Sequence, residues 1–466
     1  MQPLSRHHLA DSTGGSILGG AEGFPFQNVF TDTRRPIERG LFFALDGPNF
    51  NAHSFLAKAL EVGAGGVVIS DRHALPEGIG PDIYVLLVDN TRDALGQVGR
   101  SARLAQKATV VAITGSVGKT TMKNMVAAAL APFGKVGRTP GNYNNDIGLP
   151  LTLCGFDGDE DFIVLELGMN APGEITYLTS LAVPDVGLIT GAHAAHLEFF
   201  PSVDAIADAK AELYSALKPP ACAIANGDDD RILNRAKDLH SDKLLTYGHG
   251  SNCTARVTSV AASESGVKAQ IVTPHFEGSI TIPALGEHHA LHAAGALAVV
   301  ETLGLDVAKA ADSIAQSYRG EKHRMTLLTN PAGVRILDDC YNASPVSMEA
   351  ALKAFEGLSR GATRRIAVLG SMLELGESAA AFHTECGRIA AETGIDRLFA
   401  VGPFAKVMAE SAAEEGVSFV RTASDVEELM DEVVDSAEAG TWVLLKGSRG
   451  GRLERVLDSF QLGEAC

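Results

Sequence analysis

The chain has 466 residues, of which 45% are hydrophobic and 21% are charged, and its formal net charge at pH 7 is −18. This composition is typical of a globular protein of about three domains, and the acidic balance argues against a nucleic-acid partner. Because the chain shows no signal peptide, no apolar run that could span a bilayer and only scattered cysteines, we expect a cytoplasmic protein with reduced thiols.

Residues 1–106 are predicted to form a small N-terminal α/β domain. Three short apolar runs, at 40–45, 66–70 and 84–88, are typical of buried strands. Between the first two lies His53–Val62, whose pattern indicates a helix.

Residues 107–325 are predicted to form a central domain built on a parallel sheet. Strands are expected at 110–113, 162–167, 186–190, 221–225 and 244–247, with a helix over Met122–Leu130. Residues 254–284 alternate apolar and polar side chains, which predicts an antiparallel subsection. The alanine-rich segment His288–Leu303 then indicates a buried helix.

Residues 326–466 are predicted to form a C-terminal Rossmann-like domain. Strands at 334–337, 366–369, 398–401, 418–420 and 442–445 are separated by helices of ten or more residues, as in a doubly wound sheet. The glycine pattern GxGxxG does not occur there, so a dinucleotide site has no support. The expected fold class is therefore α/β, with three domains.

A phosphate-binding loop lies between the strand at 110–113 and the helix at 122–130. The expected nucleotide contacts are Thr114, Gly115, Ser116, Val117, Gly118, Lys119, Thr120 and Thr121. In such loops the lysine reaches the terminal phosphates and the following hydroxyl coordinates Mg²⁺. Only two residues separate Gly115 from Gly118, where the usual loop has four. This shortening favours a particular branch of ATP-using enzymes.

Three residues beyond the loop are candidate metal ligands. Glu166 ends the strand at 162–167, where ATP-binding sheets hold Mg²⁺, and His196 follows the strand at 186–190. Lys210 falls within the apolar stripe of a helix. Its ammonium could escape to water along the side chain, or burial could lower its pKa so that the neutral amine reacts with CO₂ to give a carbamate.

Amides and charged residues further along the chain could contact phosphates or substrate. Asn142 and Asn145 lie in the segment TPGNYNNDIGLP, although an asparagine- and glycine-rich turn is the alternative. The remaining candidates lie at or beyond the end of the central domain, and they could close over a nucleotide: Arg324, Asp339, Lys446 and Arg449.

Together these strings resemble the Mur ligases, the ATP-dependent amide-forming enzymes of peptidoglycan precursor assembly. The resemblance runs nearly end to end, in order, through TDTR, GLFFAL, ITGSVGKTT, TPGNYNNDIG, AHLE, AKAEL, ALGEHHALHA, DDCYNASPVSMEAAL, LGSMLELGE and LLKGSRG. It is strongest to the member that adds D-alanyl-D-alanine to the UDP-N-acetylmuramoyl-tripeptide. The resemblance implies those two substrates, ATP with Mg²⁺, and a monomer.

The resemblance also assigns roles to individual residues. It implies that Lys119, Lys210, His196 and Arg324 act in catalysis, with Lys210 carbamoylated, and that Thr120, Glu166, His196 and Lys210 hold the metal. It implies that Thr31, Asp32, Thr33 and Arg34 contact the UDP end of the substrate, and that Asn142 and Asn145 lie beside the γ-phosphate.

Two departures from the family pattern concern the nucleotide site. His289 and His292 replace two asparagines, of which the second normally contacts adenine, so we expect an imidazole contact there. The segment Lys322–Arg324 replaces the family's Pro-Gly-Arg. The alternatives are a folylpolyglutamate-type ligase, which shares the short loop, a P-loop motor or transport ATPase, and a non-catalytic UDP-sugar-binding module.

Overall fold

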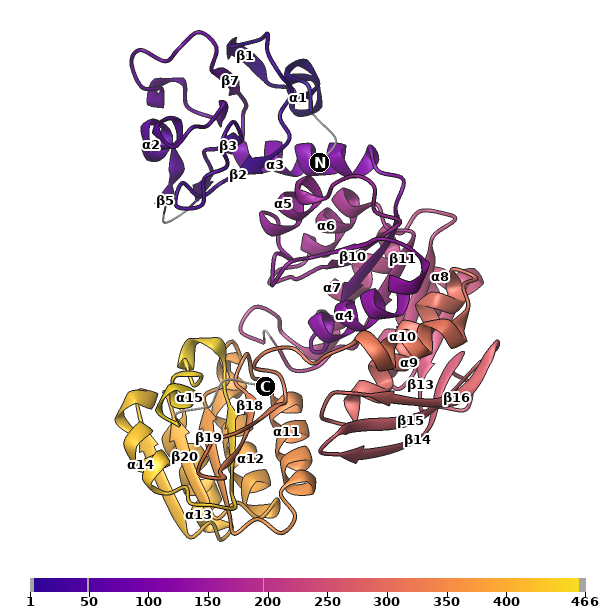
Figure 1. Ribbon diagram of the computed structural model, residues 1–466, viewed down its shortest axis with the longest axis vertical. Helices are drawn as coiled ribbons and strands as arrows, with labels where there is room; N and C mark the ends of the chain where they lie inside the picture. Colours follow the sequence, from indigo (N-terminus) through magenta and orange to yellow (C-terminus); the bar gives the residue numbers. More distant parts are fainter. Residues whose placement is uncertain (1–3, 48–49, 196, 461–466) are drawn as a thin grey trace.

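The computed structural model describes residues 4–47, 50–195 and 197–460. Three sheets with their helices follow one another along the length of the molecule, from the N-terminal part to the C-terminal part (Figure 1). Within the described residues, no helix has the length and apolarity that crossing a bilayer requires.

The N-terminal sheet has five strands in the order β1-β7-β6-β3-β2, and only β1 runs antiparallel to its neighbour. Its strands are β1 (Ser16–Gly19), β2 (Val29–Phe30), β3 (Leu41–Phe43), β6 (Gly66–Ile69) and β7 (Tyr84–Leu87). Its helices are α1 (Arg6–Thr13), α2 (Leu56–Glu61) and α3 (Thr91–Leu104), and β4 (Asp46–Gly47) pairs with β5 (Phe50–Asn51). The predicted helix at 53–62 begins instead with a 3₁₀ turn at Ala52–Phe55, because the Asn51 side chain caps it at His53.

The central sheet has nine strands in the order β16-β15-β14-β13-β12-β11-β8-β10-β9. The strands are β8 (Thr109–Thr114), β9 (Val136–Arg138), β10 (Phe162–Glu166), β11 (Val186–Ile189), β12 (Cys222–Asn226), β13 (Leu244–Gly248), β14 (Ala255–Ser263), β15 (Gly266–Thr273) and β16 (Phe276–Ile282). The helices are α4 (Lys119–Leu130), α5 (Gly148–Gly155), α6 (Glu174–Ala182), α7 (Val203–Ala216), α8 (Asp230–His240), α9 (His288–Thr302) and α10 (Val307–Ser317).

The antiparallel subsection predicted at 254–284 is confirmed, since β14, β15 and β16 pair antiparallel while the other strands are parallel. Strand β8 lies between β10 and β11. The chain therefore adds β9 and β10 on one side of β8 and β11 on the other, and the strand order reverses at β8. Ligands of open α/β sheets bind at such a switch point, outside the carboxyl ends of the strands.

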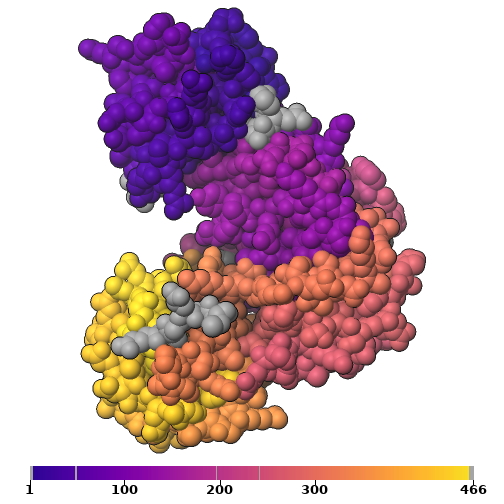
Figure 2. Space-filling model, viewed as in Figure 1, coloured from indigo at the N-terminus to yellow at the C-terminus, as the bar shows by residue number. Residues whose placement is uncertain are grey.

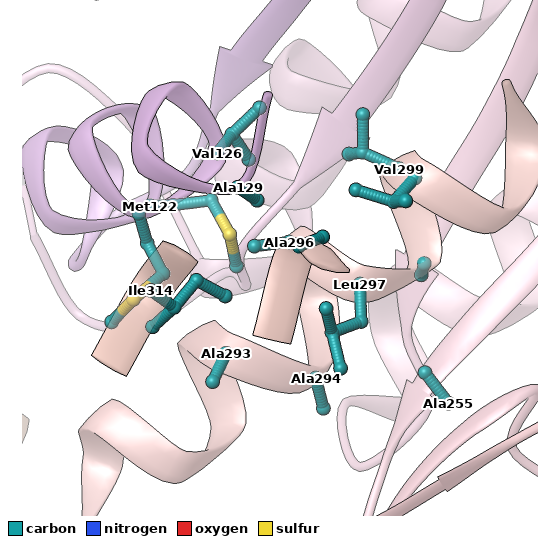
Figure 3. Close-up of a cluster of buried hydrophobic side chains, with 14 of the residues drawn as sticks. Met122, Val126, Ala129, Ala255, Ala293, Ala294, Ala296, Leu297, Val299 and Ile314 are labelled. Atoms are coloured by element: carbon teal, nitrogen blue, oxygen red, sulfur yellow. The ribbon is translucent and has the colours of Figure 1, made fainter. Parts of the chain in front are cut away.

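Two apolar cores cover the two faces of the central sheet. On one face α4 packs against α9, where small side chains let the two backbones approach (Figure 3). Met122 and Val126 of α4 lie over Ala293 and Ala296 of α9. This packing fixes α4, the helix that begins at Lys119, against the sheet.

The C-terminal sheet has six strands in the order β17-β18-β22-β19-β20-β21, with only β17 antiparallel. The strands are β17 (Thr326–Thr329), β18 (Arg335–Asp339), β19 (Arg364–Gly370), β20 (Arg397–Val401), β21 (Phe419–Ala423) and β22 (Thr441–Lys446). The helices are α11 (Pro345–Leu358), α12 (Ala379–Glu392), α13 (Ala405–Glu414), α14 (Met430–Asp435) and α15 (Arg455–Ser459). Separate cores on both faces agree with the doubly wound prediction.

A large hollow separates the N-terminal part from the C-terminal part on the face that Figure 2 shows. Where the central and C-terminal parts meet, a cavity of about 920 Å³ contains the phosphate loop on one wall and residues of β18, β22 and α11 on the other.

Candidate active site

The phosphate loop is shaped by two glycines that no other residue could replace without displacing a neighbour. Gly118 directly precedes α4 with φ +78°, and a Cβ there would lie 2.3 Å from Nε2 of His292. At Gly115 a Cβ would lie 1.8 Å from Oγ1 of Thr190. The loop backbone is therefore pressed against both neighbours, and it opens onto the cavity at the N-terminus of α4, where backbone N–H groups favour an anion.

Lys119 lies in the cavity wall and folds back onto its own loop. Its Nζ donates to the carbonyl oxygens of Gly115 at 2.8 Å and of Ser116 at 3.4 Å. Desolvation lowers the pKa of Lys119, and the carboxylate of Glu166 opposes this shift. A phosphate that offered more negative oxygen atoms could draw this ammonium away from the two carbonyl groups.

Glu166 is held at the carboxyl end of β10 by two hydrogen bonds from the cavity wall. Thr120 Oγ1 donates to its Oε2 at 3.0 Å, and Asn144 Nδ2 donates to its Oε1 at 2.8 Å. A hydroxyl and a carboxylate side by side are hard oxygen ligands of the kind that Mg²⁺ prefers. The donor set at Thr120 and Glu166 therefore fits a magnesium ion beside the phosphate loop.

Lys123 and Asn144 complete this cluster, and the sequence-based prediction missed both. Lys123 is 2% exposed, its Nζ lies 3.6 Å from Oε2 of Glu166, and it donates to the carbonyl oxygens of Thr139 at 2.9 Å and Gly141 at 3.2 Å. Burial lowers its pKa, and the Glu166 carboxylate opposes that effect. The sequence did contain a signal for Lys123, because it follows Lys119 by one helical turn within a helix rich in alanine and methionine.

Both predicted asparagines, Asn142 and Asn145, line the cavity, and the side chain of Asn145 also holds the backbone that follows it. Asn145 Oδ1 accepts from the backbone N–H of Gly148 at 2.8 Å, at the start of α5. The Asn145 side-chain oxygen is therefore used locally, and Asn144 is the amide that reaches the carboxylate of Glu166.

The linker and the C-terminal part bring four more predicted residues to the cavity: Arg324, Asp339, Lys446 and Arg449. Asp339 and Lys446 end the neighbouring strands β18 and β22 and are register partners. Lys446 is 2% exposed, and its Nζ lies 2.5 Å from Oδ2 of Asp339 and 3.3 Å from the carbonyl oxygen of Asn342. Arg449 is more exposed and pairs with Glu454 at 2.9 Å.

Arg324 lies in the linker between the central and C-terminal sheets and reaches the phosphate loop. Its guanidinium carbon lies 4.3 Å from the centre of the Tyr341 ring, and Nη2 donates to Thr120 Oγ1 at 3.3 Å. The flanking residues His323 and Met325 both have left-handed backbone angles, with φ of 62° and 50°. The predicted arginine therefore meets the predicted metal ligand.

His292 of α9 lies against the loop, and two further histidines, His288 and His289, pack around it. Burial lowers the pKa of all three, and that of His292 falls to about 3. The imidazole of His292 is therefore neutral at physiological pH, so it can stack or hydrogen-bond in the cavity without adding charge.

Lys210 lies on α7 and is 2% exposed, so the structure favours a buried amine over an ammonium that extends to water. Desolvation lowers its pKa well below the ordinary value, and the nearby ammonium of Lys119 lowers it further. His196, another predicted metal ligand, lies outside the described residues.

Thr31, Asp32, Thr33 and Arg34 follow β2 in the N-terminal part and are not among the residues that line the cavity. Asp32 and Arg34 form a surface ion pair at 2.8 Å, and the hydrogen bonds from Arg34 lower the pKa of Asp32 to about 2. A substrate that touched both regions would have to extend along the hollow between them.

Comparison with known proteins gives full-length matches. The Mur ligase middle domain matches residues 113–300, and the Mur ligase glutamate ligase domain matches residues 323–449. The chain is 36% identical over 434 residues to the UDP-N-acetylmuramoyl-tripeptide–D-alanyl-D-alanine ligase of Bacillus subtilis, covering 92% of each chain.

Solved structures agree with this match. The structure of MurF from Acinetobacter baumannii superimposes with a TM-score of 0.88 at 28% identity, covering 99% of both chains. MurF from Thermotoga maritima in complex with ADP gives a TM-score of 0.80 at 28% identity, covering 93% of this chain and 97% of that one. With both domain families matched and a relative of this identity aligned over nearly its whole length, the chain belongs to the Mur ligase family.

Proposed function

We propose that this protein is an ATP-dependent ligase that joins D-alanyl-D-alanine to UDP-N-acetylmuramoyl-tripeptide in the synthesis of peptidoglycan precursors. The observation that carries the proposal is the meeting, in one cavity, of the short phosphate loop with the Thr120–Glu166 pair and the cationic wall of Arg324 and Lys446. The two substrates are those in the names of the curated relatives that match over nearly their whole length.

The proposed reaction has two steps, and the negative charge of the transferred phosphate must be neutralised in both. The γ-phosphoryl group of ATP moves to the C-terminal carboxylate of the tripeptide, so that ADP leaves and an acyl phosphate forms. The amine of D-alanyl-D-alanine then attacks the acyl carbon and gives up a proton, and phosphate leaves with the electrons of the broken carbon–oxygen bond. Because phosphoryl transfer asks little covalent chemistry of a protein, positioning and charge neutralisation supply most of the rate enhancement.

The residues of the cavity divide these tasks. Lys119 and the loop N–H groups would hold the terminal phosphates, and Arg324 would stabilise the charge that develops during transfer. Thr120 and Glu166 would hold Mg²⁺, which neutralises phosphate charge when bound, with His196 and a carbamoylated Lys210 as further ligands. Asn142 and Asn145 would lie beside the γ-phosphate.

The remaining contacts concern the ends of the substrates. His292 would contact adenine and Asp339 the ribose, while Lys446 and Arg449 would face the reacting carboxylate. Thr31, Asp32, Thr33 and Arg34 would bind the UDP end. We further propose a cytoplasmic monomer whose boundaries between domains lie at 106/107 and 325/326.

Phosphate release from ATP tests this function directly. We expect release only with the UDP-linked tripeptide and D-alanyl-D-alanine together, matched one-to-one by the ligated product. A UDP-linked dipeptide is the control for the acceptor, and glutamate in place of the dipeptide amine tests the folylpolyglutamate-type alternative. Release that needed neither substrate would indicate a motor or transport ATPase instead and would overturn the proposal.

A further inference from the structure

The linker that carries Arg324 is attached to the end of β18 by a small cluster of three side chains. His323 Nδ1 lies 2.6 Å from Oδ2 of Asp338, and Sγ of Cys340 lies 2.9 Å from the other carboxylate oxygen, Oδ1. The third side of the triangle, from Cys340 Sγ to His323 Nδ1, measures 3.7 Å. An imidazole nitrogen, a carboxylate and a thiol thus converge within 4.8 Å of one another.

We propose that His323, Asp338 and Cys340 form a binding site for a divalent transition metal of the zinc type, separate from the magnesium ligands of the cavity. Zinc binds thiolate at about 2.3 Å, imidazole nitrogen at about 2.0 Å and carboxylate oxygen at about 2.0 Å. Tetrahedral ligands at those bond lengths lie roughly 3.3–3.6 Å apart. The 3.7 Å separation of sulfur and nitrogen already suits this geometry, and the carboxylate would withdraw by less than about 1 Å.

Burial and access also fit an ion of this class. Asp338 and Cys340 are buried. The Asp338 carboxylate accepts hydrogen bonds from the Cys340 thiol and, at 3.3 Å, from the Cys340 backbone N–H, and it contacts the His323 imidazole, so a cation bound there would face a buried negative charge. The His323 side chain is 16% exposed, so the cluster lies close to the protein surface, and a water molecule would complete a four-coordinate site. A thiolate and an imidazole select against Mg²⁺, which prefers oxygen ligands.

Metal uptake would replace the hydrogen bonds of the cluster by coordinate bonds, and the displaced protons can be accounted for. The proton on Sγ of Cys340 leaves to solvent, and a neutral His323 shifts its proton from Nδ1 to Nε2, so one proton is released for each ion. The bound ion would tie the linker to β18. Two neighbouring hydrogen bonds already join the linker to the end of β18. The Tyr341 N–H donates to the carbonyl oxygen of His323 at 3.1 Å, and the Met325 N–H donates to Asp339 Oδ1 at 3.2 Å.

Cobalt is the probe that distinguishes this site from the cavity. The full chain, freed of metal by chelation and then kept in excess Mg²⁺, is titrated with Co²⁺ while absorption is followed. We expect a thiolate-to-cobalt charge-transfer band that saturates at one ion per chain and disappears when Zn²⁺ is added. Co²⁺ bound at Thr120 and Glu166 has no sulfur ligand and gives no such band.

Variants assign the band to the cluster. Cys340→Ser should abolish it, His323→Gln should weaken Co²⁺ binding at least about 10-fold, and the matched control Cys253→Ser should keep it. Circular dichroism checks that each variant folds; if Cys340→Ser does not, the more exposed position 323 decides. The proposal is wrong if the wild-type chain gives no band, or if the band and the affinity survive in His323→Gln.

Discussion

Arg324 donates from Nη2 to Oγ1 of Thr120 at 3.3 Å, joining the linker before the C-terminal sheet to the first turn of α4. Thr120 in turn donates to Glu166, so one hydroxyl lies between the guanidinium and the carboxylate. The stacking of Arg324 on Tyr341 fixes the arginine to the C-terminal part. A nucleotide that bound at the loop and contacted Thr120 or Arg324 would therefore change the position of the linker.

Replacing Lys119 by alanine should reduce substrate-dependent phosphate release by about 10²-fold or more, because one electrostatic contact to transferring charge typically has that effect. Within the part of the chain that the structure describes, its ammonium donates only to two carbonyl groups of its own loop, so the fold should persist. Stopped-flow phosphate detection and circular dichroism measure the two effects. The exposed Lys107, replaced in the same way, is the control. A near-normal rate in the Lys119 variant would remove the loop lysine from the chemistry.

Replacing Lys123 by methionine should destabilise the protein by about 3 kcal/mol, because removing one member of a buried ion pair leaves the other uncompensated. The methionine fills similar volume, so the loss reflects the interactions with Glu166 and with the carbonyl groups of Thr139 and Gly141. Urea unfolding of the single variants and of Lys123→Met/Glu166→Gln completes a double-mutant cycle. Additive effects of the two substitutions would show that the pair does not interact.

Binding of ATP analogue and UDP-linked tripeptide together should compact the protein. The cavity has one wall from each of two sheets. Among the described residues, few hydrogen bonds join the two walls beyond the linker; one of them runs from the Glu198 N–H to the carbonyl oxygen of Glu374 at 3.1 Å. Closure around bound ligands is the usual behaviour of such clefts. Small-angle scattering should show a smaller radius of gyration with both ligands than with either alone. Equal dimensions in all four samples would contradict closure.

The order of strand, glycine turn, lysine and hydroxyl was sufficient to predict the phosphate loop, since local geometry and local chemistry coincide there. The position of Glu166 beside the loop was predictable for a similar reason, because the carboxyl end of a parallel strand has a known place in the sheet, whereas its role as a metal ligand stays a prediction. The structure places its carboxylate 3.0 Å from Thr120. Strand periodicity also predicted the antiparallel subsection.

Contacts between distant segments could not be predicted in the same way. Three asparagines in four residues look equivalent in the sequence, and only the backbone path turns Asn144 toward Glu166 and Asn145 toward the start of α5. Asp339 and Lys446 were each predicted as ligand contacts. Their mutual pairing depends on the register of β18 with β22, which periodicity does not fix.

Lys210 should carry a carbamate in the active protein. Desolvation on α7 lowers the pKa of Lys210 well below its ordinary value, which favours the neutral amine, the form that reacts with CO₂. The amine nitrogen bonds to the carbon of CO₂ and loses a proton, which leaves an anion on oxygen. Such an oxygen is a suitable ligand for Mg²⁺, and the ion would offset the cost of burying the anion.

Substitutions at Lys210 separate this modification from a simple ammonium. Lys210→Ala should lose ligation while nucleotide binding at the loop largely survives, and a short carboxylic acid added to that variant should restore part of the rate by placing an anionic oxygen in the gap. Lys210→Arg should also fail, because a guanidinium keeps its charge and forms no carbamate. Lys218→Arg, at an exposed position just after α7, is the matched control. Incorporation of ¹³CO₂ should give a carbamate resonance in the wild-type chain that both Lys210 variants lack. Full activity of Lys210→Arg would show that a positive charge suffices at this position and that no carbamate is needed.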